Sequence, residues 1–161
     1  GGQQLAVDDA FDPGWRRSDK TNAPIRCQDL REARDVDRAL QLVERAMRLN
    51  PHYPPHYLYQ LALAQFGLNR LADAAGSLER AISVNRDDYW SQRLLLATYG
   101  LLGRRDDAAK VIVAIKDKER RGRAASYDPL TIKAIAYWYP FANRVDADRF
   151  ADGLRQAGVP D

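Results

Sequence analysis

The sequence predicts an all-α protein, an α-α superhelix of about three helix pairs followed by a C-terminal capping helix pair. Three observations predict this fold class. Apolar residues recur at helical spacing, the pattern repeats after 34 to 35 positions, and Pro, Asn and Gly interrupt the chain between the periodic segments. An internal period of 20 to 50 residues is typical of supersecondary units that stack on one another.

The repeat is visible when the sequence is compared with itself. Residues 44–47 read Glu-Arg-Ala-Met, and residues 79–82 read Glu-Arg-Ala-Ile, 35 positions later. A further shift of 34 positions carries the second unit onto the third, as Leu61, Asn69, Ala74 and Leu78 fall on Leu95, Gly103, Ala108 and Ile112. Each unit therefore contains two amphipathic helices.

The chain divides into three regions. Residues 1–23 predict an irregular lead-in, because turn-forming residues there replace any apolar period. Residues 24–123 predict the three helix pairs, with breaks at Asn50-Pro51 and at Pro54-Pro55, since proline cannot donate a hydrogen bond inside a helix. We expect Asn69 and Gly103 to end the first helices of the second and third pairs in a left-handed conformation.

Residues 124–161 predict the capping helices. Pro129 marks a helix start that runs to Tyr139, and a last helix follows with Phe150 and Leu154 on its apolar face and a stop at Gly158. A stack of repeats exposes an apolar end unless another element covers it. We therefore expect this pair to cover the last repeat.

The repeating unit resembles the tetratricopeptide repeat (TPR). The resemblance lies in the signature of large, Leu and small residues, followed by Ala, large and Ala, which the second unit carries as Leu58, Leu61, Ala62, Ala74, Leu78 and Ala81. The alanines are small where two helices cross closely. The third unit departs from the pattern, with Leu96 at a small position and Arg120 in place of the terminal proline, which Arg86 also replaces in the second unit.

Residues 36–161 are also similar to C-terminal TPR segments of proteobacterial proteins that carry an upstream nucleotide-cyclase or DNA-binding regulatory domain, on the strings 44–54 and 153–161. This resemblance implies that Asp161 is near a natural C-terminus and that any catalytic or DNA-binding part lies outside the chain. The chain begins Gly-Gly-Gln, which indicates a fragment.

Composition excludes several classes of protein. The chain has 161 residues, a net charge of +3 and one cysteine, Cys27, so it is neither disulfide-stapled nor strongly basic. Its apolar runs fall far short of the roughly 20 residues that span a bilayer, so we expect no membrane span. A reducing interior is the default for such a chain, and we predict a cytoplasmic location.

No pattern indicates an active site, a metal or a cofactor, and we predict no enzyme activity. His52 and His56 have helical metal-ligand spacing, but the two prolines between them break the helix that would aim both rings at one ion. Cys27 occupies a small helix-contact position without a nearby His and acid pattern, so we expect it to pack rather than react.

Charged clusters have structural explanations. Asp87-Asp88 and Asp106-Asp107 stand at expected helix starts, where acids satisfy free backbone amides. The basic run has acids interleaved with it, which predicts a solvated helix end and not a nucleic-acid surface: Lys116, Lys118, Arg120, Arg121 and Arg123, with Asp117 and Glu119.

In TPR arrays the first helix of each unit lines a concave groove. The resemblance maps this groove onto Gln28, Arg31, His56, Tyr59, Leu63, Phe66, Trp90, Arg93 and Ala97. Tyr, Trp and Arg are typical of interface hot spots. Leu63 and Phe66 fit packing between the units as well as they fit the groove.

Two hypotheses on function follow. The first is a noncatalytic domain that binds a peptide or protein segment in the groove, as part of a larger signalling or regulatory protein. The alternative is a module that dimerises such a protein through exposed apolar faces on its end helices. A small-ligand site between the repeats and the lead-in is a third, weaker hypothesis, because no motif supports it.

Overall fold

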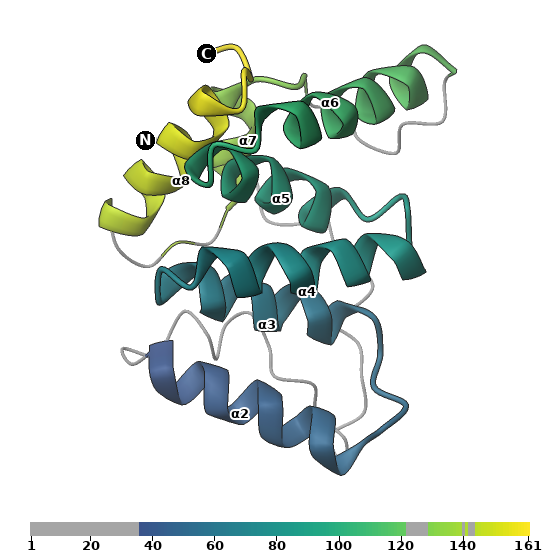
Figure 1. Cartoon of the computed structure of the whole chain (residues 1–161), viewed down its shortest axis with the longest axis vertical. Helices are drawn as coiled ribbons and strands as arrows, with labels where there is room; N and C mark the ends of the chain where they lie inside the picture. Colours follow the sequence, from purple (N-terminus) through teal and green to yellow (C-terminus); the bar gives the residue numbers. More distant parts are fainter. Residues whose placement is uncertain (1–35, 122–128, 140, 142–143) are drawn as a thin grey trace, which may run out of the picture.

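A computed structural model describes residues 36–121, 129–139, 141 and 144–161 of the chain (Figure 1). Within these segments it contains helices and no strands, which confirms the predicted all-α class. The helices are α2 (Val36–Leu49), α3 (His56–Gly67), α4 (Leu71–Val84), α5 (Tyr89–Leu101), α6 (Arg105–Arg120), α7 (Ile132–Trp138) and α8 (Arg144–Gln156). The predicted lead-in, residues 1–23, and Cys27 lie outside the described residues.

Helices α2 to α6 pack against one another in chain order. α2 contacts α3, α3 pairs with α4, α4 contacts α5, and α5 pairs with α6. The tight turns inside the two pairs contain Asn69 with φ 58° and Gly103 with φ 71°. These left-handed residues confirm the helix ends predicted from the sequence.

Helix α5 lies at the centre of this packing. All its residues from Ser91 to Gly100 are buried, and it contacts α3, α4, α6 and α8. A buried run of this length includes every side of a helix, so other elements surround α5 on all sides. The small residues Ala62, Ala74 and Ala108 are completely buried, as expected for positions where helices cross closely.

The C-terminal helices contact the last predicted helix pair through its first helix. The sequence predicted that they cover this pair, and α8 packs on α5, while neither α7 nor α8 makes an extensive contact with α6. Figure 1 shows α8 (yellow) and α6 (green) on different sides of α5. Among the described helices only α5 makes an extensive contact with α6, and Val113 on the outward side of α6 is exposed.

A crossing of two glycines explains why α8 packs on α5. A Cβ atom on Gly100 would lie 1.9 Å from the carbonyl oxygen of Gly153, and a Cβ atom on Gly153 would lie 2.4 Å from the carbonyl oxygen of Ala97. Because neither glycine has a side chain, the backbones of α5 and α8 come into direct contact. No other residue fits at either position without a shift of the backbone.

Arg149 connects α8 to the end of α3. Its Nη2 atom donates hydrogen bonds to the carbonyl oxygens of Phe66, at 2.7 Å, and Gly67, at 3.2 Å, and it pairs with Asp146 at 2.7 Å. The last carbonyls of a helix have no partner inside the helix and carry a partial negative charge. Arg149 satisfies two of them, so α8 is held by α3 as well as by α5.

Candidate functional site

The candidate site is the side of α3 and α5 on which the groove residues were predicted, which we call the inner face. It consists of His56, Tyr59, Leu63 and Phe66 on α3 and Trp90, Arg93 and Ala97 on α5. The two helices are in contact, so these residues belong to one surface. The remaining predicted groove residues, Gln28 and Arg31, lie outside the described residues.

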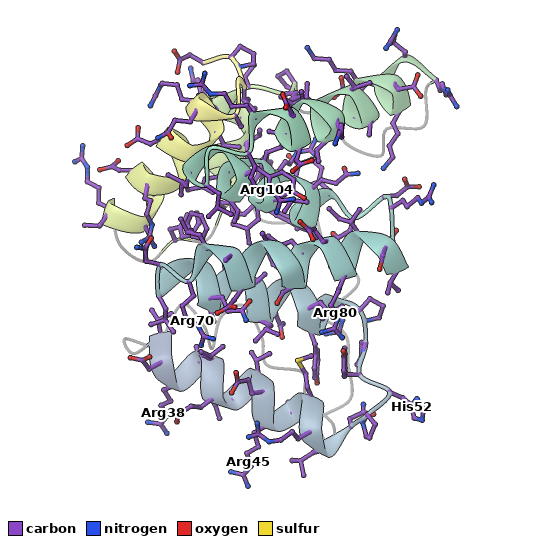
Figure 2. All side chains as sticks on the ribbon, viewed as in Figure 1. Arg38, Arg45, His52, Arg70, Arg80 and Arg104 are labelled. Atoms are coloured by element: carbon purple, nitrogen blue, oxygen red, sulfur yellow. The ribbon has the colours of Figure 1, made fainter. Side chains whose placement is uncertain are left out.

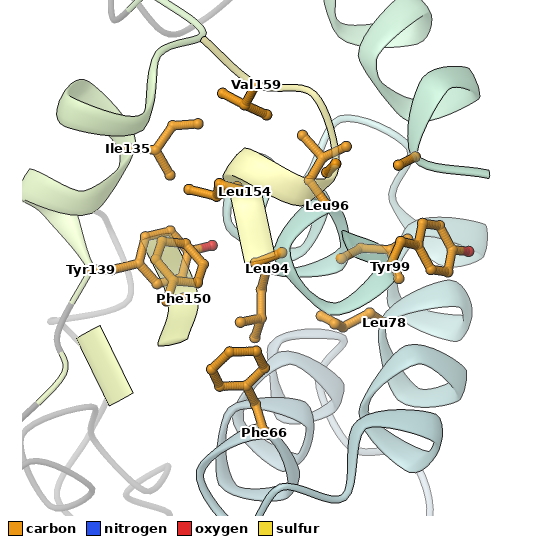
Figure 3. Close-up of a cluster of buried hydrophobic side chains, with 14 of the residues drawn as sticks. Phe66, Leu78, Leu94, Leu96, Tyr99, Ile135, Tyr139, Phe150, Leu154 and Val159 are labelled. Atoms are coloured by element: carbon orange, nitrogen blue, oxygen red, sulfur yellow. The ribbon is translucent and has the colours of Figure 1, made fainter. Parts of the chain in front are cut away.

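The C-terminal segment covers much of the inner face. The ring of Phe66 lies 6.2 Å from that of Phe150 and 5.8 Å from that of Phe141 (Figure 3). The ring of Trp90 lies 5.5 Å from that of Tyr139, whose hydroxyl donates a hydrogen bond to the Trp90 carbonyl. The chain's own polypeptide therefore occupies the place that a partner would take in an open groove.

Burial separates the inner face into two parts. Phe66 and Ala97 are completely buried, and Tyr59 and Arg93 are 7% and 2% exposed. Of the two readings that the sequence left open for Phe66, the structure supports core packing, because the residue belongs to the central apolar cluster. His56, Leu63 and Trp90 are half-buried and are the accessible part of the inner face.

Arg93 is a buried cation among aromatic rings. Its Cζ atom lies 3.4 Å from the centre of the Tyr89 ring, and its Nη1 atom donates a 3.4 Å hydrogen bond to the Tyr89 carbonyl. Burial lowers the pKa of Arg93, and Tyr89 and Tyr139 oppose this change. An arginine keeps its charge under such conditions, so the face of the Tyr89 ring contributes to stabilising it by cation–π interaction.

Asp88 organises the start of α5. Its carboxylate accepts hydrogen bonds from the backbone N–H of Trp90, at 3.2 Å, and from the hydroxyl of Ser91, at 2.5 Å. The helix-start role predicted for this acid is therefore confirmed. The same carboxylate faces His56, whose pKa is lowered mainly by burial, while the charge of Asp88 acts in the opposite direction.

His56 is expected to make the fold sensitive to mild acid. Its pKa is below 6.5 in the folded chain, so the unfolded chain binds the proton first as the pH falls through 6.5. The free energy of unfolding should therefore decrease between pH 6.5 and the lower folded-state pKa, and His56→Gln should reduce this decrease. Urea titrations at several pH values measure it.

His52→Gln is the matched control, because His52 is exposed. The free energy of unfolding of this variant should depend on pH as it does in the parent chain. An equal effect of both substitutions would show that burial of His56 is not the cause.

Other charged groups form surface ion pairs. Asp107 accepts from Lys110 and Arg104, and these hydrogen bonds lower its pKa. In the basic run, Lys118 pairs with Asp87, and Arg121 pairs with Asp117 at 2.8 Å. These pairs are those of a solvated helix end, while Arg123 lies outside the described residues.

Metal-ligand clusters and membrane-spanning helices are both absent from the segments that the structure describes. These segments contain no group of three or more His, Cys, Asp or Glu residues placed to hold a metal ion. None of their helices combines the length and the apolar character needed to cross a bilayer.

Sequence reasoning missed several residues of the site. Gly153, Arg149 and Tyr139 hold the C-terminal segment on the inner face, but none of them was predicted as a site residue, and Tyr139 was predicted only as part of an apolar helix. The apolar stripe of α8 was a signal for its packing, although the stripe does not say which helix it contacts.

Comparison of the chain with protein-family models, with curated proteins and with solved structures finds no match. An assignment of function therefore depends on the geometry described above.

Proposed function

We propose that the chain is a noncatalytic, TPR-like interaction domain that binds a peptide or protein segment at its inner face, within a larger signalling or regulatory protein in the cytoplasm. One observation carries the proposal: the inner face already accommodates a polypeptide segment, the chain's own α8 with Tyr139 and Phe141. A surface that packs one amphipathic helix has the shape and apolar character for helix recognition.

The partner segment is expected to lie beside α8. Phe66 and Ala97 are completely covered, whereas His56, Leu63 and Trp90 keep part of their surface accessible. Trp90 offers a large aromatic area next to the buried Arg93, a combination that is typical of residues with a strong effect on binding.

Selection from a peptide display library on the full chain tests this proposal. The affinity of an enriched peptide should fall at least about tenfold, or about 1.4 kcal/mol, when His56→Ala and Trp90→Leu are combined. These changes remove a polar contact and a large aromatic surface at the accessible part of the inner face. Isothermal titration calorimetry measures the affinity, and thermal unfolding checks that the variant is folded.

Val113→Ala is the control, because Val113 is 60% exposed on α6, which is outside the inner face. Its affinity for the peptide should equal that of the parent chain. A peptide that binds the double variant as tightly as the parent contradicts the proposed site.

The open side of α6 favours self-association as a second candidate function. Val113 is exposed there, and within the described segments neither α7 nor α8 makes an extensive contact with α6. A symmetric dimer would bury it against a second copy. Sedimentation equilibrium separates the two functions, since a monomer at the highest concentration contradicts self-association.

A further inference from the structure

The outward side of α2 carries a row of exposed residues that includes two leucines and two arginines. It consists of Gln41, Leu42, Arg45, Arg48 and Leu49, which we call the α2 outer stripe. The opposite side of the helix, with Ala39, Leu40 and Val43, is buried. Within the described segments the stripe therefore lies on the exposed side of α2 and belongs to a different surface from the inner face.

The two leucines of the stripe lie in one line along the helix. They are seven residues apart, which is two turns or about 10 Å at the usual helical rise. Leu42 is 41% exposed and Leu49 is 76% exposed. One exposed leucine needs no explanation, but a spacing of seven residues is the spacing at which helices pack against one another along a seam.

The arginines of the stripe give it a positive charge. Figure 2 shows Arg45 on the side of α2 that faces away from α3. Arg45 and Arg48 have no ion pair within the described segments, unlike Arg70, which pairs with Asp73, and Arg155, which pairs with Asp152. Two carboxylates of a partner can therefore form ion pairs with these two guanidinium groups.

The charge and the width of the α2 outer stripe indicate which class of partner it binds. In a symmetric dimer through the stripe, Arg45 and Arg48 would face their own copies, so like charges oppose this contact. A membrane surface requires a broad apolar helix face, and two leucines beside a polar Gln41 form a narrow one. A helix of another protein with carboxylates next to spaced apolar residues complements both the charge and the line of leucines.

We propose that the α2 outer stripe docks an acidic amphipathic helix of a partner protein. Leu42 and Leu49 pack against apolar residues of that helix, and Arg45 and Arg48 pair with its glutamates or aspartates. The stripe is a second binding surface beyond the proposed inner-face function, so each surface can be tested alone.

A synthetic peptide tests the proposal on the full chain. The probe is a fluorescein-labelled helix of Glu, Ala and Leu with leucines seven residues apart and a glutamate one turn from each, and fluorescence anisotropy measures its binding. Combining Arg45→Glu and Arg48→Glu should weaken binding at least tenfold. A peptide with Lys in place of Glu should bind this variant more tightly than it binds the parent chain.

The matched control combines Arg105→Glu and Arg120→Glu, which make the same charge change at exposed positions of α6. It should retain at least half of the parent affinity, and circular dichroism checks the helix content of both variants. The leucine variant, Leu42→Ala with Leu49→Ala, should also weaken binding, because the proposal requires the apolar contact.

Several outcomes would overturn the proposal. They are no binding of the acidic peptide to the parent chain, an equal loss in the α6 control, or unchanged binding by the leucine variant. Tighter binding to phosphatidylserine vesicles, lost in the same α2 variants, would assign the stripe to a lipid surface. Concentration-dependent dimerisation that the α2 variants abolish would assign it to a second copy.

Discussion

Replacing Gly153 by alanine is expected to lower the free energy of unfolding by about 3 kcal/mol, although alanine is the better helix former. The added Cβ atom would lie 2.4 Å from the carbonyl oxygen of Ala97. The Cβ atom is fixed to the backbone of α8, and the carbonyl oxygen belongs to the backbone of α5. No side-chain rotation relieves the overlap, so α8 must move away from α5. Urea denaturation followed by circular dichroism measures the loss.

Gly76→Ala is the matched control for this substitution. Gly76 also lies inside a helix, α4, but a Cβ atom there would have no neighbour within 4 Å. This variant should be more stable than the parent by up to about 1 kcal/mol, because only the helix propensity changes. We expect the free energy of unfolding to change in opposite directions in the two variants. A Gly153→Ala chain that is more stable than the parent would contradict the direct contact of α5 with α8.

Phe150→Ala is expected to be about as damaging, with a loss of roughly 3–5 kcal/mol. Phe150 is completely buried, and its ring centre lies 4.2 Å from that of Tyr139 and 5.1 Å from that of Phe141. Its removal leaves a cavity between α8 and the inner face. Trp90 packs on Tyr139, so its fluorescence should also shift to the red as water enters.

Val145→Ala on the same helix provides the comparison, since Val145 is 75% exposed. Its effect should stay within about 0.5 kcal/mol. If Phe150→Ala cost no more than this control, α8 could not be a stabilising cover of the inner face.

The repeat and its turns could be predicted because their signals are local. The shift of 34 to 35 positions aligned α3 with α5 and α4 with α6, and Asn69 and Gly103 identified the left-handed ends. A left-handed residue at a helix end depends mainly on its neighbours in the sequence, and so does the apolar period of a helix. The agreement at these elements has this physical origin.

The position of α8 could not be predicted, because it depends on two residues far apart in the chain. No periodic pattern in the sequence relates Gly100 to Gly153, and a glycine inside a helix ordinarily destabilises that helix. The surroundings of Arg93 also include a distant residue, because the charge of Arg93 interacts with Tyr139, 46 positions further along the chain. Patterns in one segment report which side of a helix is apolar, but they do not report which element covers it.

The central position of α5 affects how the whole domain loses its structure. In an open array of repeats each unit contacts only its neighbours, so unfolding begins at one end and proceeds unit by unit. Here α5 is enclosed by α3, α4, α6 and α8, and loss of any of them exposes part of its apolar surface to water. Unfolding should therefore be cooperative across the described helices and should not proceed unit by unit.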